Sequence, residues 1–112
     1  IAPHIVQFEK KANAEIFARV RQFAEYLKDL QREHEDAVAG YKTAVESRVM
    51  VTVLMELLEK RPFQLDAQAI APVNAIDSTL RRQWIPDGFV WDEEWIAAYP
   101  SKTYWWLYGR PL

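Results

Sequence analysis

The fold is decided by residues 16–30, which read IFARVRQFAEYLKDL. Apolar residues recur in this stretch in alternating steps of four and three, a period of about 3.5 residues that is typical of one apolar face of an α-helix. The other positions include charged residues at 19, 21, 25, 28 and 29, as on the solvated side of an amphipathic helix. We call the apolar face the seam, and its five members are Ile16, Val20, Phe23, Leu27 and Leu30.

Outward from the seam, the sequence predicts a helical hairpin over residues 1–61. Gly40 suits a residue that ends a helix in the left-handed conformation. The spacing of Thr43 and Glu46 fits a capping box at the start of a second helix. We therefore expect helices near 4–39 and 43–60. The alternative is a single rod that continues through Gly40 at a cost of about 1 kcal/mol.

The second helix contains an unusually apolar run, VMVTVLM at residues 49–55. A run that is apolar on all sides of a helix is typical of an interior position. Pro62 then ends the helix. We therefore expect this run to be buried.

Residues 62–112 differ in composition from the first half, because they hold five of the six prolines and all five tryptophans. A helix is predicted from the spacing of Val73, Ile76, Leu80 and Trp84. A short helix is predicted over 92–98, and the final stretch SKTYWWLYGRPL looks extended. The expected fold class is all-α: a single helical domain over 1–112, with a long hairpin, one or two shorter helices and an extended Trp/Tyr-rich C-terminal tail.

Composition excludes several classes of protein. With 112 residues, half of them apolar, and a net charge of −2, the chain is too apolar and too weakly charged to be disordered. No apolar run is long enough to span a bilayer, so we expect a soluble domain. The absence of cysteine excludes disulfides and thiol catalysis. Residue 1 is Ile rather than Met, which fits a trimmed fragment or the removal of a targeting presequence, and the compartment stays open.

The sequence carries no recognisable catalytic or metal-binding motif. The two histidines, His4 and His34, take part in no Glu-x-x-His or HExxH pattern. No nucleophile elbow, P-loop or dinucleotide fingerprint is present. We therefore assign no catalytic, cofactor-binding or metal-binding residues and expect no enzymatic activity. An enzyme of unrecognised type remains the second alternative.

A geometric mismatch leads to the principal functional hypothesis. A first helix of roughly 36 residues would be about 54 Å long, whereas a compact chain of this size has a radius of gyration of about 13 Å. The seam would then overhang the globule and dock on another chain, unless the C-terminal half folds back to cover it. The sequence thus predicts a non-catalytic structural or assembly subunit whose partners are other protein subunits, in a hetero- or homo-oligomer.

The aromatic C-terminus would act as a strap in the same complex, because Trp and Tyr are frequent anchors of protein interfaces. If the tail is extended, Trp105 and Trp106 send their rings to opposite sides. The expected partner-binding residues, besides the seam, are Trp91, Trp95, Tyr104, Trp105, Trp106 and Tyr108. A tryptophan-rich core and a membrane-surface belt are alternative explanations of this composition.

The sequence leaves one other function open and argues against a second. The first alternative function is a self-contained helical binding module with an apolar pocket lined by Met50, Met55 and Trp84, or a small protein inhibitor. Nucleic-acid binding is disfavoured, because Arg81 and Arg82 are a small basic footprint and are followed by a run of acidic residues.

Overall fold

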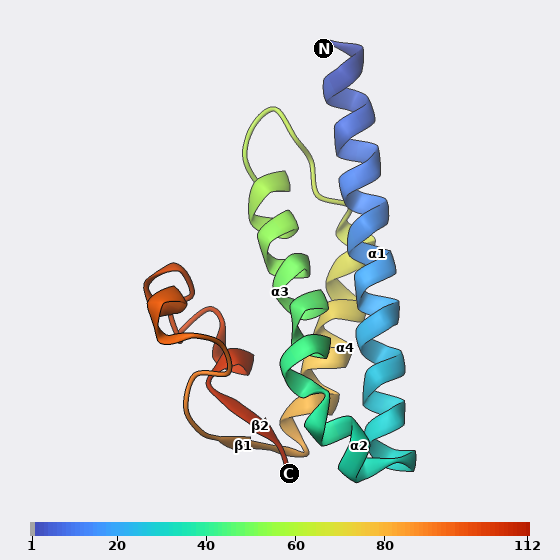
Figure 1. Cartoon of the computed structure of the whole chain (residues 1–112). Coiled ribbons are helices and arrows are strands. Elements are labelled where there is room, and N and C mark those ends of the chain that lie inside the picture. The colour runs from blue at the N-terminus through green and yellow to red at the C-terminus, as the bar shows by residue number, and fades with distance from the viewer. Residues whose placement is uncertain (1) are drawn as a thin grey trace.

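The computed structural model describes residues 2–112 and confirms the helical fold class. Three helices lie side by side along the long dimension of the molecule: α1 (Pro3–Arg32), α3 (Tyr41–Leu58) and α4 (Ile70–Arg81). The short α2 (His34–Ala39) crosses one end of this bundle and links α1 to α3 (Figure 1). The molecule is elongated, with extents of 48 × 32 × 18 Å, because α1 alone is about 45 Å long.

The predicted hairpin is present, but its turn lies elsewhere in the sequence. α1 ends at Arg32 rather than near residue 39, because Glu33 leaves the helical conformation with φ −132° and ψ 59°. α2 then reverses the chain direction. Gly40 has φ −86° and ψ 0°, so it does not adopt the predicted left-handed conformation. The single rod is also wrong, because α1 ends at Arg32 and α3 runs back beside it (Figure 1). Thr43 lies inside α3 and does not cap it, which corrects the predicted capping box.

The connection from α3 to α4 is fastened to the side of α1. The Asn13 side chain donates to the Gln64 carbonyl at 3.1 Å and accepts from the Asp66 amide at 2.8 Å. The Asp66 carboxylate in turn accepts from the Gln68 amide at 2.9 Å and caps a 3-10 turn, η1 (Ala67–Ala69), that leads into α4. These contacts fix where α4 begins on the surface of α1.

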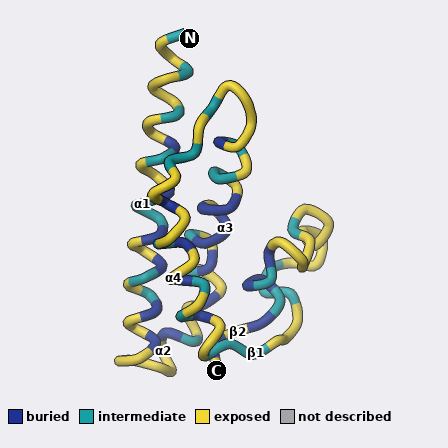
Figure 2. The backbone as a smooth tube through the Cα atoms, turned by 180° about the vertical axis from the view of Figure 1, so that it is seen from behind, coloured by how far each residue is buried: buried dark blue, intermediate teal, exposed yellow. Residues whose placement is uncertain are grey.

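The hydrophobic core lies between the three long helices (Figure 2). The seam of α1 forms one side of it, and Ile16 and Phe23 have no exposed surface. α3 and α4 supply the facing side chains, which are fully or almost fully buried: Val45, Val49, Val51, Leu58, Val73, Ile76 and Leu80. The possibility that other parts of the chain cover the seam is therefore the one that the structure supports.

An overhang does exist, but at the N-terminal end of α1 and not along the seam. The first buried residue of α1 is Ala12, about two and a half turns into the helix. Before it, Val6 and Phe8 are 50% and 43% exposed. Phe8 meets Phe63 of the connection at a ring-centroid distance of 5.3 Å, which partly covers this end of the helix.

Residues 82–112, which we call the C-terminal segment, fold back beside α3 with little regular structure. They form β1 (Trp84–Pro86), η2 (Glu93–Ala98), η3 (Trp105–Leu107) and β2 (Gly109–Pro111). The two strands pair antiparallel (Figure 1). The short helix predicted over 92–98 is the 3-10 helix η2.

The α-helix predicted for the second half is α4, and it ends at Arg81. The apolar spacing that predicted it extends to Trp84, but this residue is not helical. Trp84 belongs to β1. The Trp/Tyr-rich tail is present and extended at β2, but Trp105 and Trp106 lie in a 3-10 turn. Their rings contact each other at 5.5 Å instead of pointing to opposite sides of a strand.

Gly109 is required where the two strands meet. A Cβ atom at this position would lie 2.1 Å from the ring of Trp84 and 2.4 Å from the Ile85 carbonyl oxygen. These distances are too short for any side chain, so the close approach of β2 to β1 depends on the glycine.

Candidate functional site

The five seam residues lie inside the bundle and present no open surface. Their exposed fractions range from 0% for Ile16 and Phe23 to 6% for Val20. α3 and α4 cover them, so the expectation that this face is free to dock on another chain is not met.

The structure divides the six aromatic residues that the sequence assigned to a strap. Tyr104 and Trp106 are buried in the core of the protein's own fold. Trp91, Trp105 and Tyr108 are half-buried. Trp95 is 49% exposed and is the member of the set that most clearly offers an interaction surface.

Trp106 belongs to a junction that joins the C-terminal segment to α3 and α4. The Arg48 guanidinium, 4% exposed, forms a two-point ion pair with Asp77 at 2.7 and 2.9 Å. It also donates to the Thr52 hydroxyl at 2.7 Å. Its other contact is the face of Trp106, 3.8 Å from the ring centroid, a cation–π arrangement. The Tyr41 hydroxyl donates to the Trp106 carbonyl at 2.5 Å, and burial raises the pKa of this tyrosine.

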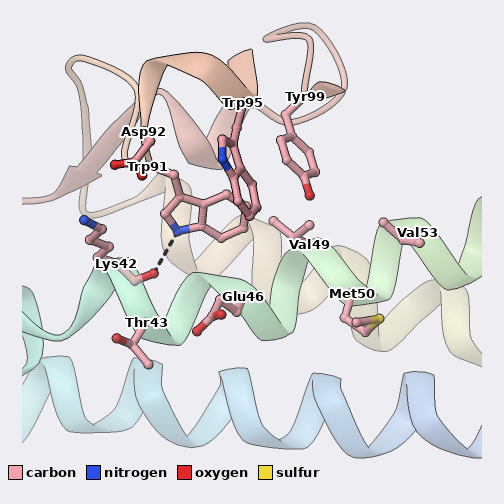
Figure 3. A pocket seen from close by; sticks show the side chains of 10 residues that line it. All are labelled: Lys42, Thr43, Glu46, Val49, Met50, Val53, Trp91, Asp92, Trp95 and Tyr99. Atoms are coloured by element: carbon pink, nitrogen blue, oxygen red, sulfur yellow. Dashed lines mark hydrogen bonds between the residues drawn. The ribbon is translucent and has the colours of Figure 1, made fainter. Parts of the chain in front are cut away.

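A groove opens between α3 and the C-terminal segment (Figure 3). Its cavity volume is about 560 Å³. One wall is a face of α3, and it consists of Lys42, Thr43, Glu46, Val49, Met50 and Val53. The opposite wall comes from around η2 and consists of Trp91, Asp92, Trp95 and Tyr99.

The aromatic wall of the groove is held in place by contacts of its own. The Trp91 indole N–H donates to the Lys42 carbonyl at 3.0 Å, which ties the segment to the start of α3 (Figure 3). Trp95 and Tyr99 meet the Trp91 ring edge to face at centroid distances of 6.2 and 5.4 Å. The Tyr99 carbonyl accepts from the Tyr108 hydroxyl at 2.6 Å. The wall is therefore preorganised rather than formed on binding.

Apolar side chains remain exposed at this groove from elements far apart in the sequence. On α3, Met50 is 38% and Val53 is 41% exposed. On η2, Trp95 is 49% exposed. The expectation that the whole run 49–55 is buried is therefore wrong, because one face of α3 is left to the groove.

Charged groups at the groove are mostly acidic. Glu46 and Asp92 are part of its lining, and Glu93 and Glu94 follow on η2. Lys42 is the cation of the lining. The groove thus combines an apolar floor with a rim of net negative charge.

The pocket predicted from Met50, Met55 and Trp84 does not form as a unit. Met50 lines the groove, but Trp84 lies in β1, where it packs edge to face on Trp105 at 5.1 Å. Within residues 2–112, no group of three or more acidic or histidine side chains is arranged to hold a metal ion. In the same part of the chain, no helix is both long and apolar enough to cross a membrane.

One feature of the sequence indicates the groove. The run 49–55 is more apolar than one buried helix face requires, and its excess residues, Met50 and Val53, are the ones left exposed. The pairing of that face with Trp91, Trp95 and Tyr99 depends on a contact across about 40 residues of chain, which periodicity does not report.

Comparison with known proteins identifies no relative of this chain. No protein-family model, no curated protein and no solved structure matches it.

Proposed function

We propose that this protein is a non-catalytic accessory subunit that docks on a partner protein through the groove between α3 and η2. The observation that carries the proposal is the exposure of Met50, Val53 and Trp95 around one preorganised cavity. Large apolar side chains gathered on a surface are typical of protein interaction sites, whereas scattered ones are not. In this proposal the groove replaces the seam as the docking surface, and the buried seam contributes to the core of the bundle.

The composition of the groove supports a protein partner. Tryptophan and tyrosine are over-represented among the residues that dominate binding energy at interfaces, and methionine adapts to irregular surfaces. The groove presents tryptophan, tyrosine and methionine side chains, with polar and charged groups at its edge, as the rim of an interface does.

Site-specific photo-crosslinking in source cells tests this proposal. A benzoylphenylalanine at position 95 should capture a defined protein, because this side chain projects from the groove wall. The matched control carries the same group at Ile70, which is 46% exposed on α4 and does not line the groove. Identical capture from both positions, or none from position 95, contradicts docking through the groove.

A small-ligand binding module is the second candidate, and the size of the cavity favours it. About 560 Å³ lies within the range of roughly 300–1,000 Å³ that is usual for small-molecule sites. A thermal-shift screen of apolar compounds would reveal it, since a ligand that binds the native state raises the melting temperature. The same compounds should then fail to stabilise a Trp95→Glu variant.

A further inference from the structure

The geometry points to a basic amphipathic helix of the partner protein as the occupant of the groove. This inference rests on the proposed function and adds the chemistry of the bound segment. Three features of the groove support it: its length, the kind of backbone in its walls, and its charge.

The length of the groove matches a short helix. Its α3 wall runs from Lys42 to Val53, and a helix that rises 1.5 Å per residue covers about 17 Å over this distance. This is about three helical turns. A partner helix of about a dozen residues would match this length, and its apolar side chains at i, i+3, i+4 and i+7 would face the groove.

The backbone of the walls favours a helix over an added strand. A peptide that binds as a strand pairs with the free edge of a sheet. The walls here are α3 and the residues in and around the 3-10 helix η2, and neither wall contains a strand. The sheet of the protein, β1 with β2, contributes no residue to the groove.

The charge of the groove selects a basic partner segment. In the lining, the carboxylates of Glu46 and Asp92 outnumber the cation of Lys42, and Glu93 and Glu94 follow Asp92 on η2. Complementary charge at the rim of an interface speeds association and rejects partners of the wrong sign. The faces of Trp95 and Tyr99 add to this preference, because a lysine or arginine within about 6 Å of such a ring is attracted to it.

Two synthetic helical peptides of about a dozen residues test the inference. Both carry leucine at the i, i+3, i+4, i+7 positions, and they differ in having lysine or glutamate at the polar positions. Affinity is measured from tryptophan fluorescence in physiological salt, and the bound surface from amide NMR shifts. We expect the lysine peptide to bind about ten-fold more tightly than the glutamate peptide and to shift the amides of α3 and η2.

Charge reversal shows whether the groove causes this preference. In the Glu46→Lys/Asp92→Lys double variant, the ratio of the affinity for the lysine peptide to that for the glutamate peptide should fall to about one or below. The matched control, Glu35→Lys/Glu59→Lys, makes the same change of net charge at exposed positions outside the groove and should retain the preference. A preference that survives in the groove variant, or equal affinity of both peptides for the wild type, overturns the inference.

The two proposals fail in different ways. Specific crosslinks from position 95 together with no binding of either peptide overturn the basic helix and leave the accessory-subunit proposal standing. If position 95 gives no crosslink that the control position 70 lacks, the accessory-subunit proposal is overturned, and this inference with it. Self-association of the wild type that the Glu46→Lys/Asp92→Lys variant loses identifies a second copy of the chain as the occupant and also overturns a partner helix.

Discussion

The helical bundle of residues 3–81 and the C-terminal segment are held together by different kinds of contact. The bundle buries aliphatic side chains that recur with the period of a helix, such as Ile16, Leu27 and Leu80. The C-terminal segment has short 3-10 and strand elements and depends on ring pairs and on side chains that bond to distant backbone groups. The bundle is therefore specified by local periodicity, whereas the C-terminal segment depends on contacts among its own aromatic residues and on links to the bundle such as the Trp91–Lys42 hydrogen bond.

The largest test of this comparison replaces the tryptophan at the junction. Trp106→Ala should lower the free energy of unfolding by about 3–5 kcal/mol, as the loss of a buried aromatic side chain does. It also removes the ring that lies on Arg48. The matched control is Trp95→Ala in the same segment, whose exposed ring should contribute less than about 0.5 kcal/mol to stability.

Denaturant unfolding of both variants provides the measurement. A loss of stability in Trp106→Ala as small as that in Trp95→Ala would mean that the C-terminal segment adds little to the bundle. The two regions would then be independent rather than one folding on the other.

The ion pair at the junction gives the next largest effect. Asp77→Ala leaves the Arg48 guanidinium buried without its carboxylate, which should cost about 3 kcal/mol. Asp29→Ala removes the partner of Arg32 from an exposed pair and should cost no more than about 1 kcal/mol. Amide exchange should accelerate in the C-terminal segment as well as in α4 for Asp77→Ala. Acceleration confined to α4 would show that the pair does not join the two regions.

The two regions also differ in how far the sequence predicts them. The spacing of the seam predicts the first helix, and the later apolar positions predict α4, because helix periodicity is local. The turn was misplaced, since Glu33 carries no signal for its non-helical conformation and Gly40 adopts an ordinary one. Nothing local predicts that Arg48 would pair with Asp77, because these residues lie on different helices.

The groove was predicted only in part. Trp91 and Trp95 were expected to bind a partner, and they line it together with Tyr99. The α3 wall was missed, because an apolar helix face looks the same in sequence whether it is buried or left to an open groove. That distinction depends on where the C-terminal segment folds.

Alkaline pH should lower the free energy of unfolding through two tyrosines, one buried and one half-buried. Burial raises the pKa of Tyr41 and of Tyr26 in the folded chain. Because the folded pKa lies above the unfolded one, the stabilisation is complete below about pH 10 and is lost as the pH rises beyond it. The slope is about 1.4 kcal/mol per pH unit for each tyrosine that ionises only on unfolding.

Unfolding of the wild type and Tyr41→Phe across the alkaline range measures this effect. The variant loses the hydrogen bond to the Trp106 carbonyl at every pH, but its stability should fall less steeply above about pH 10. Parallel curves for the two proteins would show that ionisation of Tyr41 is not coupled to unfolding.

A smaller loss of stability is expected from a change where β1 pairs with β2 in the C-terminal segment. Gly109→Ala places a methyl group against the Trp84 ring and the Ile85 carbonyl, which should cost about 1–3 kcal/mol. Gly88→Ala is the control, because a Cβ there meets nothing within 4 Å, and it should change stability by less than about 0.5 kcal/mol. Faster amide exchange in β1 and β2, with α1 unchanged, would locate the damage in the C-terminal segment.

The smallest effect on stability is expected where the two regions face each other across the groove. Met50→Ser/Val53→Ser removes exposed apolar surface from α3 and should change the free energy of unfolding by less than about 0.5 kcal/mol. Val51→Ser on the same helix, at a fully buried position, should cost about 2–4 kcal/mol. If the double variant instead destabilises the protein as strongly as Val51→Ser, Met50 and Val53 serve folding, and their exposure no longer argues for an occupant. If it is neutral in folding yet abolishes binding of the lysine peptide, this face of α3 is apolar for recognition and not for stability.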